Sequence, residues 1–255
     1  MELLALQPTN SDIFGLAQGR FARVPAALTI TPDDDISREV LLVEENLPEK
    51  SVSIDNNFRP SAYMRRTALL PVTHNLWPTS DYVPVSVARL AWLDIGLLVC
   101  MTCRETEEPR RVFRQHRSPV FRDSCLEAFI QPLPAVPGYI NVEANAVGTV
   151  LAGWGPRRGN RYLLTDEQIE ALHLQHMLEK RDDAWYWQIC FVLSSELLTG
   201  LMGTEVFLQK GNALRANFYK CGDATKYPHY FAWQPIRLPQ PDFHQPGYFG
   251  NIILD

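Results

Sequence analysis

Short segments in which hydrophobic and polar residues alternate fill the chain from residue 85 to the C-terminus. A period of two is typical of β-strands, because successive side chains point to opposite faces of a sheet. Residues 85–92 and 97–104 flank the turn Asp94-Ile-Gly96 and predict a β-hairpin. Further strands are predicted at 125–131, 139–145 with a return strand to 154, 185–191, 214–220, 229–233 and 249–254.

Helical patterns are short. One turn is predicted at 165–170 and a capped turn begins at Ser194. Residues 166–180 fit both a helical stripe and a strand. We choose a strand after residue 170, because the turn at 181–183 and the alternation beyond it complete a hairpin.

Many short strands, Gly/Pro turns and little helix predict an all-β fold. We expect an antiparallel β-sandwich of two sheets, jelly-roll or immunoglobulin-like, with one or two short helical turns. We treat residues 1–255 as a single domain with its core at 66–255. Residues 1–65 are weakly patterned and form a less certain N-terminal extension.

Composition and charge narrow the classes of partner. The chain has 255 residues, 46% of them hydrophobic, which is enough for a sizeable core. The net charge is −5, and glutamates interrupt the one dense basic stretch at 104–122, so we expect no nucleic-acid partner and no anionic membrane surface. No apolar run reaches the ~18 residues of a membrane-spanning helix.

The N-terminal sequence Met1-Glu-Leu-Leu-Ala lacks the basic region of a secretory signal. We therefore expect a cytoplasmic location for the sequence as given, and an extracytoplasmic one if a leader precedes it.

Five cysteines, an odd number, are expected to be reduced, buried and structural: Cys100, Cys103, Cys125, Cys190 and Cys221. Cys100 and Cys103 form a C-x-x-C, but residues three apart on a strand point to opposite faces and no second pair completes a zinc site. His173-x-x-His176 would need a helix and a third ligand. The sequence therefore predicts no metal site.

The segment 139–145 carries a polar row on one predicted face, formed by Asn141, Glu143 and Asn145. Asparagine is a poor strand former, so an ordinary solvent-facing surface explains this row less well than a binding role does. Amides and carboxylates in fixed geometry suit the recognition of hydroxyl groups. Glu127 is expected on the same side of its own strand, opposite Leu126 and Ala128.

Aromatic residues accompany these polar groups. Phe121 precedes the predicted strand 125–131, and Phe243 lies between Asp242 and His244, which suggests an exposed ring. A pyranose presents apolar C–H faces to an aromatic ring and a belt of hydroxyls to carboxylates and amides. The combination therefore favours a sugar-binding site.

Three segments resemble a known family: the hairpin 91–101, the segment 119–130 with its Asp-Ser-x-x-Glu-x-Phe core, and the ending Phe243-His-Gln-Pro-Gly-Tyr-Phe-Gly250 with its hydrophobic tail. From residue 88 onward the chain resembles the family 9 carbohydrate-binding modules and their family-9-like relatives. The run 217–223 is similar to the stand-alone members of that group.

The resemblance implies a non-catalytic protein that binds a mono- or oligosaccharide, linked to polysaccharide catabolism. Phe121 and Phe243 fall where the family grips the sugar between two tryptophans, so this chain has smaller rings at both positions. Glu127 falls at a hydroxyl-binding carboxylate, and Asn141 near a polar contact supplied by an arginine. The predicted site comprises Phe121, Glu127, Asn141, Glu143 and Phe243, with Asn145, Asn217, Lys220 and Trp233 as secondary candidates.

No cofactor is expected. Relatives in this family can carry structural calcium, but no Asp-rich loop in this sequence has a convincing set of ligands.

Two other functions remain open. Glu127 and Glu143 could be the acid and nucleophile of a glycosidase, depending on the distance between their carboxyls. The family 9 sandwich is also similar in architecture to DOMON-type domains that bind haem b. The nominal haem ligands here are Met101, His176, Met177 and Lys220, and no C-x-x-C-H motif exists for covalent attachment.

Overall fold

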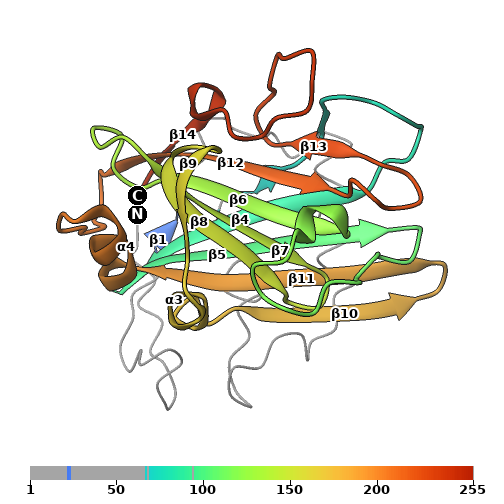
Figure 1. Ribbon diagram of the computed structural model, residues 1–255, viewed down its shortest axis with the longest axis horizontal. Helices are drawn as coiled ribbons and strands as arrows, with labels where there is room; N and C mark the ends of the chain where they lie inside the picture. The colour runs from blue at the N-terminus through green and yellow to red at the C-terminus, as the bar shows by residue number, and fades with distance from the viewer. Residues whose placement is uncertain (1–21, 24–66, 68, 94, 255) are drawn as a thin grey trace.

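The computed structural model describes residues 22–23, 67, 69–93 and 95–254. Two antiparallel sheets face one another in this part of the chain (Figure 1), which confirms the predicted β-sandwich. The expected N-terminal extension at 1–65 lies outside the described residues, apart from the short strand β1. None of the helices that the structure describes is long and apolar enough to cross a membrane.

The first sheet, sheet A, is built around the predicted hairpin. In spatial order it contains β1 (Ala22–Arg23), β4 (Val85–Leu93), β5 (Gly96–Glu105), β11 (Ala184–Ser194) and β10 (Gln175–Arg181), with β2 (Leu70–Pro71) also paired to β4. The hairpins β4–β5 and β10–β11 both form as the turns at 94–96 and 181–183 predicted.

The second sheet, sheet B, carries the polar row. In spatial order it contains β3 (His74–Asn75), β13 (Tyr230–Ala232), β12 (Ala213–Cys221), β6 (Cys125–Gln131), β7 (Tyr139–Asn145), β8 (Val150–Arg157) and β9 (Asn160–Leu163). The C-terminal strand β14 (Gly250–Ile253) pairs with β12. The bounds of β6 and β7 are those predicted from the alternation.

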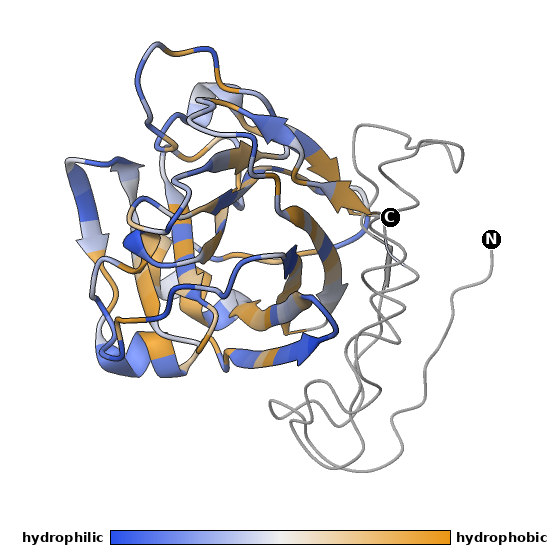
Figure 2. Cartoon of the chain, turned by 90° about the vertical axis from the view of Figure 1, so that its right-hand side faces the viewer, coloured by the Kyte–Doolittle hydropathy of each residue, from blue (hydrophilic) through white to orange (hydrophobic). Residues whose placement is uncertain are grey.

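The hydrophobic core lies between the two sheets. Sheet B contributes every second residue of β6 and β7, among them Leu126, Ala128, Ile140 and Val142, all at most 1% exposed. The hydropathy colouring of Figure 2 accordingly shows hydrophobic residues along strands of both layers. The alternation therefore assigned the faces of these strands correctly.

The outer face of sheet B is buried as well, although a sheet of a two-layer sandwich usually exposes its outer face. Val120, Tyr219, Phe243 and Phe249 form a second hydrophobic cluster there, built from strands and from the connections that cover them. The polar row on β7 therefore lies under loops rather than in open solvent.

The pairing of β5 with β11 corrects the expectation that all cysteines are reduced. Cys100 lies directly opposite Cys190, and the two form a disulfide on the outer face of sheet A. They are 90 residues apart, so no local motif indicated the pairing. Cys103, Cys125 and Cys221 are free and buried, as expected.

Two α-helices occur in the described residues. α3 (Asp166–Glu170) begins at the predicted turn, and α4 (Ser195–Met202) is longer than the single turn predicted at Ser194. Two short 3₁₀ helices, η2 (Val120–Arg122) and η3 (Pro246–Tyr248), lie in the connections.

A capping box forms the start of α3, and we expect its removal to lower the stability of the protein slightly. The Thr165 side chain accepts a hydrogen bond from the Gln168 backbone N–H, and the Gln168 side chain accepts one from the Thr165 N–H. We expect Thr165→Ala to lower the free energy of unfolding by about 1 kcal/mol in urea denaturation. Thr165→Ser keeps the acceptor and is the control. Equal losses in the two variants would contradict the capping role.

Candidate functional site

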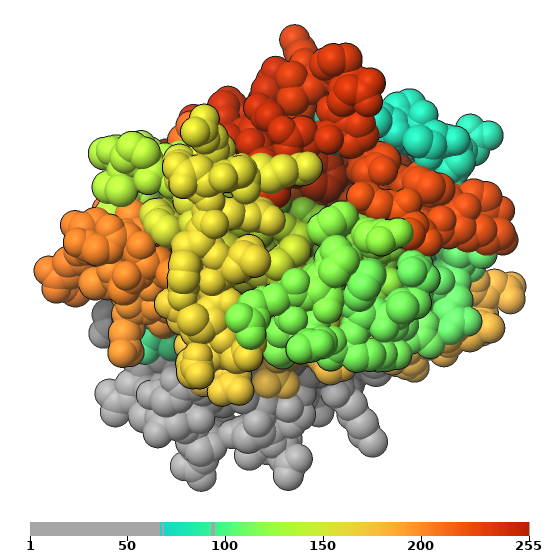
Figure 3. Space-filling model, in the orientation of Figure 1, coloured from blue at the N-terminus to red at the C-terminus, as the bar shows by residue number. Residues whose placement is uncertain are grey.

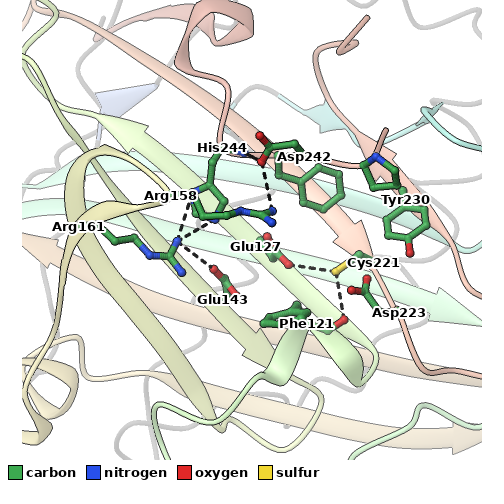
Figure 4. Close-up of a pocket in the computed structure, with 12 residues that line it drawn as sticks. Phe121, Glu127, Glu143, Arg158, Arg161, Cys221, Asp223, Tyr230, Asp242 and His244 are labelled. Atoms are coloured by element: carbon green, nitrogen blue, oxygen red, sulfur yellow. Dashed lines mark hydrogen bonds and ion pairs between the residues drawn. The ribbon is translucent and has the colours of Figure 1, made fainter. Parts of the chain in front are cut away.

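A pocket of about 330 Å³ opens on the outer side of sheet B, and we call it the central pocket. On the face seen in Figure 3, the segments around it meet at a depression. Its lining comes from sheet strands and from four connections, and comprises Phe121, Glu127, Glu143, Arg158, Arg161, Cys221, Asp223, Tyr230, Pro241, Asp242, Phe243 and His244 (Figure 4).

Two glutamates form the floor of the central pocket. β6 and β7 pair in a register that sets Glu127 directly opposite Glu143, and each residue is only 2% exposed. Glu127 Oε1 accepts a hydrogen bond of 3.0 Å from the Cys221 thiol. Glu143 Oε1 accepts one of 2.9 Å from Asn141 Nδ2 and lies 3.8 Å from Arg161 Nη1.

Burial governs the protonation of this pair. It raises the pKa of Glu143 to about 7, against the opposing effect of Arg161 and Arg158. Burial, followed by the charge of Glu143, raises the pKa of Glu127 well above its ordinary value. The floor therefore retains protons near neutral pH and offers both hydrogen-bond donors and acceptors.

Arg161 reaches the floor from β9 because a glycine lies beneath it. A Cβ atom at Gly153 on β8 would lie 3.3 Å from Arg161 Cδ, so a larger residue would crowd the arginine stem. Arg161 Nη1 donates to Asn141 Oδ1 at 3.2 Å and to His244 Nε2 at 2.8 Å. Burial, followed by the charge of Arg161, lowers the pKa of His244 to about 2, so this ring is neutral.

The neutral ring of His244 in turn orients Tyr139, whose hydroxyl lies 2.7 Å from His244 Nδ1. Beside it, Arg158 forms a 3.2 Å ion pair with Asp242, a residue of the C-terminal connection. Arg158 thus pairs with the Asp242 carboxylate, and Arg161 donates to Asn141 and His244. Both arginines still line the central pocket (Figure 4).

The two phenylalanines both line the central pocket, but their environments differ. Phe121 is half-buried in η2. Phe243 is only 8% exposed, so the expectation of an exposed ring is wrong. The C-terminal connection folds back onto sheet B, where the Phe243 ring stacks on Tyr219 with centroids 4.1 Å apart.

Of the predicted site residues, the structure brings Phe121, Glu127, Glu143 and Phe243 together in the central pocket. Asn141 is fully buried behind them and positions Glu143 and Arg161.

The secondary candidates lie elsewhere. Asn145 accepts from the Thr149 N–H and donates to Phe113 O, so it fixes a loop. Asn217 exchanges hydrogen bonds with the backbone of Gln234. Trp233 packs in the core between the sheets.

Lys220 lies on the opposite face of β12, inside the sandwich. Its Nζ is 3.4 Å from Glu105 Oε1 and 2.8 Å from His229 Nε2. Met101 is fully buried in the same interior. Two of the four nominal haem ligands, Met101 and Lys220, are thus buried inside the sandwich, and we do not propose haem binding.

Several lining residues were not predicted as site residues from the sequence, among them Arg158, Arg161, Cys221, Asp223 and Tyr230. Arg158 lies in the turn between β8 and β9, and Arg161 lies at the start of β9, in a run of unremarkable composition, Arg-Arg-Gly-Asn-Arg. Only the glycines of β8 indicated that another side chain crosses that strand. Cys221 and Asp223 lie in the family-like run 217–223, which was a usable signal.

Comparisons with known proteins give a consistent picture. The model of carbohydrate-binding family 9 matches residues 59–254. A candidate carbohydrate-binding protein from Bacteroides uniformis has a similar structure, with 25% identity, a TM-score of 0.64, and coverage of 75% of this chain and 88% of that chain. No curated protein matches the chain.

Two structures of a family 9 module from Caldicellulosiruptor kristjanssonii also align. The complex with cellotriose has 10% identity and covers 81% of this chain and 88% of that one, and the complex with glucose has 11% identity and covers 79% and 90%. The TM-score is 0.44 in both cases.

Proposed function

The chain belongs to carbohydrate-binding family 9, and on this premise we propose that the central pocket binds a sugar without cleaving it. The observation that carries the proposal is the buried, directly opposed pair Glu127 and Glu143, with Arg161 beside it and Phe121 at its edge. These groups match the two surfaces of a pyranose.

The polar groups would recognise hydroxyls. Carboxyl groups accept or donate hydrogen bonds according to their protonation, and a guanidinium only donates. Glu143 and Arg161 hold each other in position through Asn141, so little side-chain entropy is lost when a ligand binds. The ring of Phe121 would cover an apolar C–H face of the sugar.

The size of the pocket favours a small ligand. A volume of about 330 Å³ is near the lower end for ligand pockets, so we propose a monosaccharide or the end of an oligosaccharide. We further propose a role in polysaccharide catabolism, as the family resemblance implies.

Phe121→Ala tests the aromatic contact. We expect it to weaken binding of the best sugar by about 1–2 kcal/mol, because it removes buried apolar area and the ring face. Calorimetric titration with mono- and disaccharides, in the presence of EDTA, measures the change. Phe207→Ala, at a phenylalanine that is 66% exposed and outside the pocket lining, is the matched control. Unchanged affinity in Phe121→Ala would remove this ring from the site.

A glycosidase is the second candidate, favoured by one observation. Glu127 and Glu143 lie directly opposite each other on neighbouring strands, and a raised pKa, as Glu127 has, is what a general acid needs. Glu127→Gln separates the two functions. In a hydrolase it would abolish turnover and leave substrate binding nearly intact, since the acid acts mainly in the transition state.

In a binding protein we expect Glu127→Gln to weaken sugar binding by about 0.5–1.5 kcal/mol, because it removes a buried, protonated carboxyl group whose hydrogen bonds to a sugar join neutral groups. Calorimetry and a reducing-sugar assay on the same samples give both readouts. Glu170→Gln, at an exposed glutamate of α3, is the control. Wild-type turnover that disappears in Glu127→Gln while affinity persists would contradict the binding proposal.

A further inference from the structure

Two thiols and a carboxyl group converge at the floor of the central pocket. Cys125 and Glu127 are two residues apart on β6 and therefore share its outer face. The pairing of β6 with β12 sets Cys221 directly opposite Cys125. The two Sγ atoms and a carboxylate oxygen of Glu127 all lie within 4.8 Å of one another.

These three side chains are buried and have few other polar partners. Their exposed fractions are 0%, 2% and 1% for Cys125, Glu127 and Cys221. Neither thiol is in a disulfide. Within the part of the chain that the structure describes, no Lys, Arg or His forms an ion pair with Glu127, which accepts a hydrogen bond of 3.0 Å from the Cys221 thiol.

The residue types select one class of metal ion. Thiolate and carboxylate ligands together suit zinc and similar divalent ions. Calcium and magnesium need a shell of oxygen ligands, and this cluster offers a single carboxyl group. Tetrahedral zinc with bonds of about 2.0–2.3 Å places its ligand atoms roughly 3.5–3.8 Å apart, which the cluster reaches with small side-chain rotations.

We propose that Cys125, Glu127 and Cys221 form a binding site for a zinc-class divalent cation. Each thiol, and the Glu127 carboxyl group where it is protonated, releases its proton to solvent when it coordinates the ion. Three protein ligands leave a fourth position, and Glu127 and Cys221 line the central pocket, so water or a ligand entering the pocket completes the coordination. The site does not depend on sugar binding.

Cobalt titration of the reduced, full-length protein under anaerobic conditions tests the proposal. Tetrahedral thiolate coordination gives Co²⁺ strong visible bands and a sulfur-to-metal charge-transfer absorption. We expect one Co²⁺ per chain, displaced stoichiometrically by Zn²⁺. Cys125→Ser and Cys221→Ser should each weaken Zn²⁺ binding by at least about 100-fold, since even indirect partners of a metal site are worth 10–100-fold.

Cys103→Ser is the matched control, because Cys103 is also a free, buried thiol but packs between the sheets, where it contacts Ser86. It should retain Co²⁺ and Zn²⁺ binding. Phe121→Ala should also retain metal binding, which separates this test from that of the sugar site.

If a cysteine variant does not fold, the cobalt spectrum of the wild-type protein still tests the proposed metal site. Wild-type protein that shows no thiolate-to-cobalt absorption, or affinity that is unchanged in both Cys125→Ser and Cys221→Ser, overturns the proposal. A Cys125–Cys221 disulfide in protein purified without reductant does so as well. Calorimetry with sugars in EDTA remains an independent measurement, so either proposal can fail alone.

Discussion

Lys220→Ala is expected to lower the free energy of unfolding by about 3–5 kcal/mol, because it leaves a carboxylate buried without its cation. Lys220 is fully buried on the inner face of β12. Its Nζ bridges the two sheets, 3.4 Å from Glu105 on β5, and also donates to Cys221 O at 3.0 Å. Glu105 is 3% exposed, so water cannot replace the lost charge.

The double variant Lys220→Met with Glu105→Gln is the control for this prediction. It removes both charges and keeps the volume. The glutamine oxygen can still accept from the Trp187 N–H, and its amide group can donate to the hydroxyl oxygens of Tyr82 and Ser124, which now donate to Glu105. We expect it to recover most of the loss in urea denaturation. A double variant as unstable as Lys220→Ala would show that packing, rather than charge, explains the effect.

The alternation of hydrophobic and polar residues was enough to predict which side chains share a face of each strand. It could not predict which segments cover that face. It placed Glu127, Asn141 and Glu143 on the face opposite the core, as the structure has them. The same rule puts Lys220 on the face of Phe218 and Ala216, inside the sandwich. Its assignment to the sugar site therefore conflicted with a signal already present in the sequence.

Contacts between distant strands could not be predicted in the same way. The disulfide joins β5 to β11, and the thiol pair of Cys125 and Cys221 joins β6 to β12. Hairpin turns fix the register of neighbours along the chain. They carry no information about which non-consecutive strands pair, so both cysteine pairs depend on the order of strands in the sheets.

The loops over sheet B were the least predictable part of the site. Phe243 has charged or polar neighbours in sequence, Asp242 and His244, yet its ring stacks on Tyr219. Arg161 lies on the edge strand β9, yet it reaches Asn141 across Gly153. Local composition reports on exposure only where a segment stays on the surface, and here the connections fold back over a sheet.

His229 is expected to destabilise the folded protein at acidic pH. Burial, followed by the charge of Lys220, lowers the pKa of His229 to about 3. An unfolded histidine has a pKa near 6.5. Between these values the unfolded state binds a proton that the folded state does not, so this histidine destabilises the fold as the pH falls. The penalty is about 2 kcal/mol at pH 5, since each pH unit is worth about 1.4 kcal/mol.

His229→Gln isolates this effect. Glu143 acts in the opposite direction, because its raised pKa, about 7, lets the folded state bind a proton before the unfolded state does. The wild-type curve therefore mixes both effects, whereas the difference between variant and wild type does not. The glutamine can still accept from Lys220 and donate to Tyr227 O, the two partners of the His229 ring.

We expect the stability of His229→Gln relative to wild type to improve by about 2 kcal/mol between pH 7.5 and pH 5. His244→Gln should behave alike, because burial and Arg161 lower the pKa of His244 to about 2. His74→Gln, at an exposed histidine of β3, is the control and should show no such change. Urea denaturation at the two pH values measures the shift. An equal stability difference at both would mean that His229 binds its proton as readily in the folded as in the unfolded state, and that the interior of the sandwich tolerates a second cation beside Lys220.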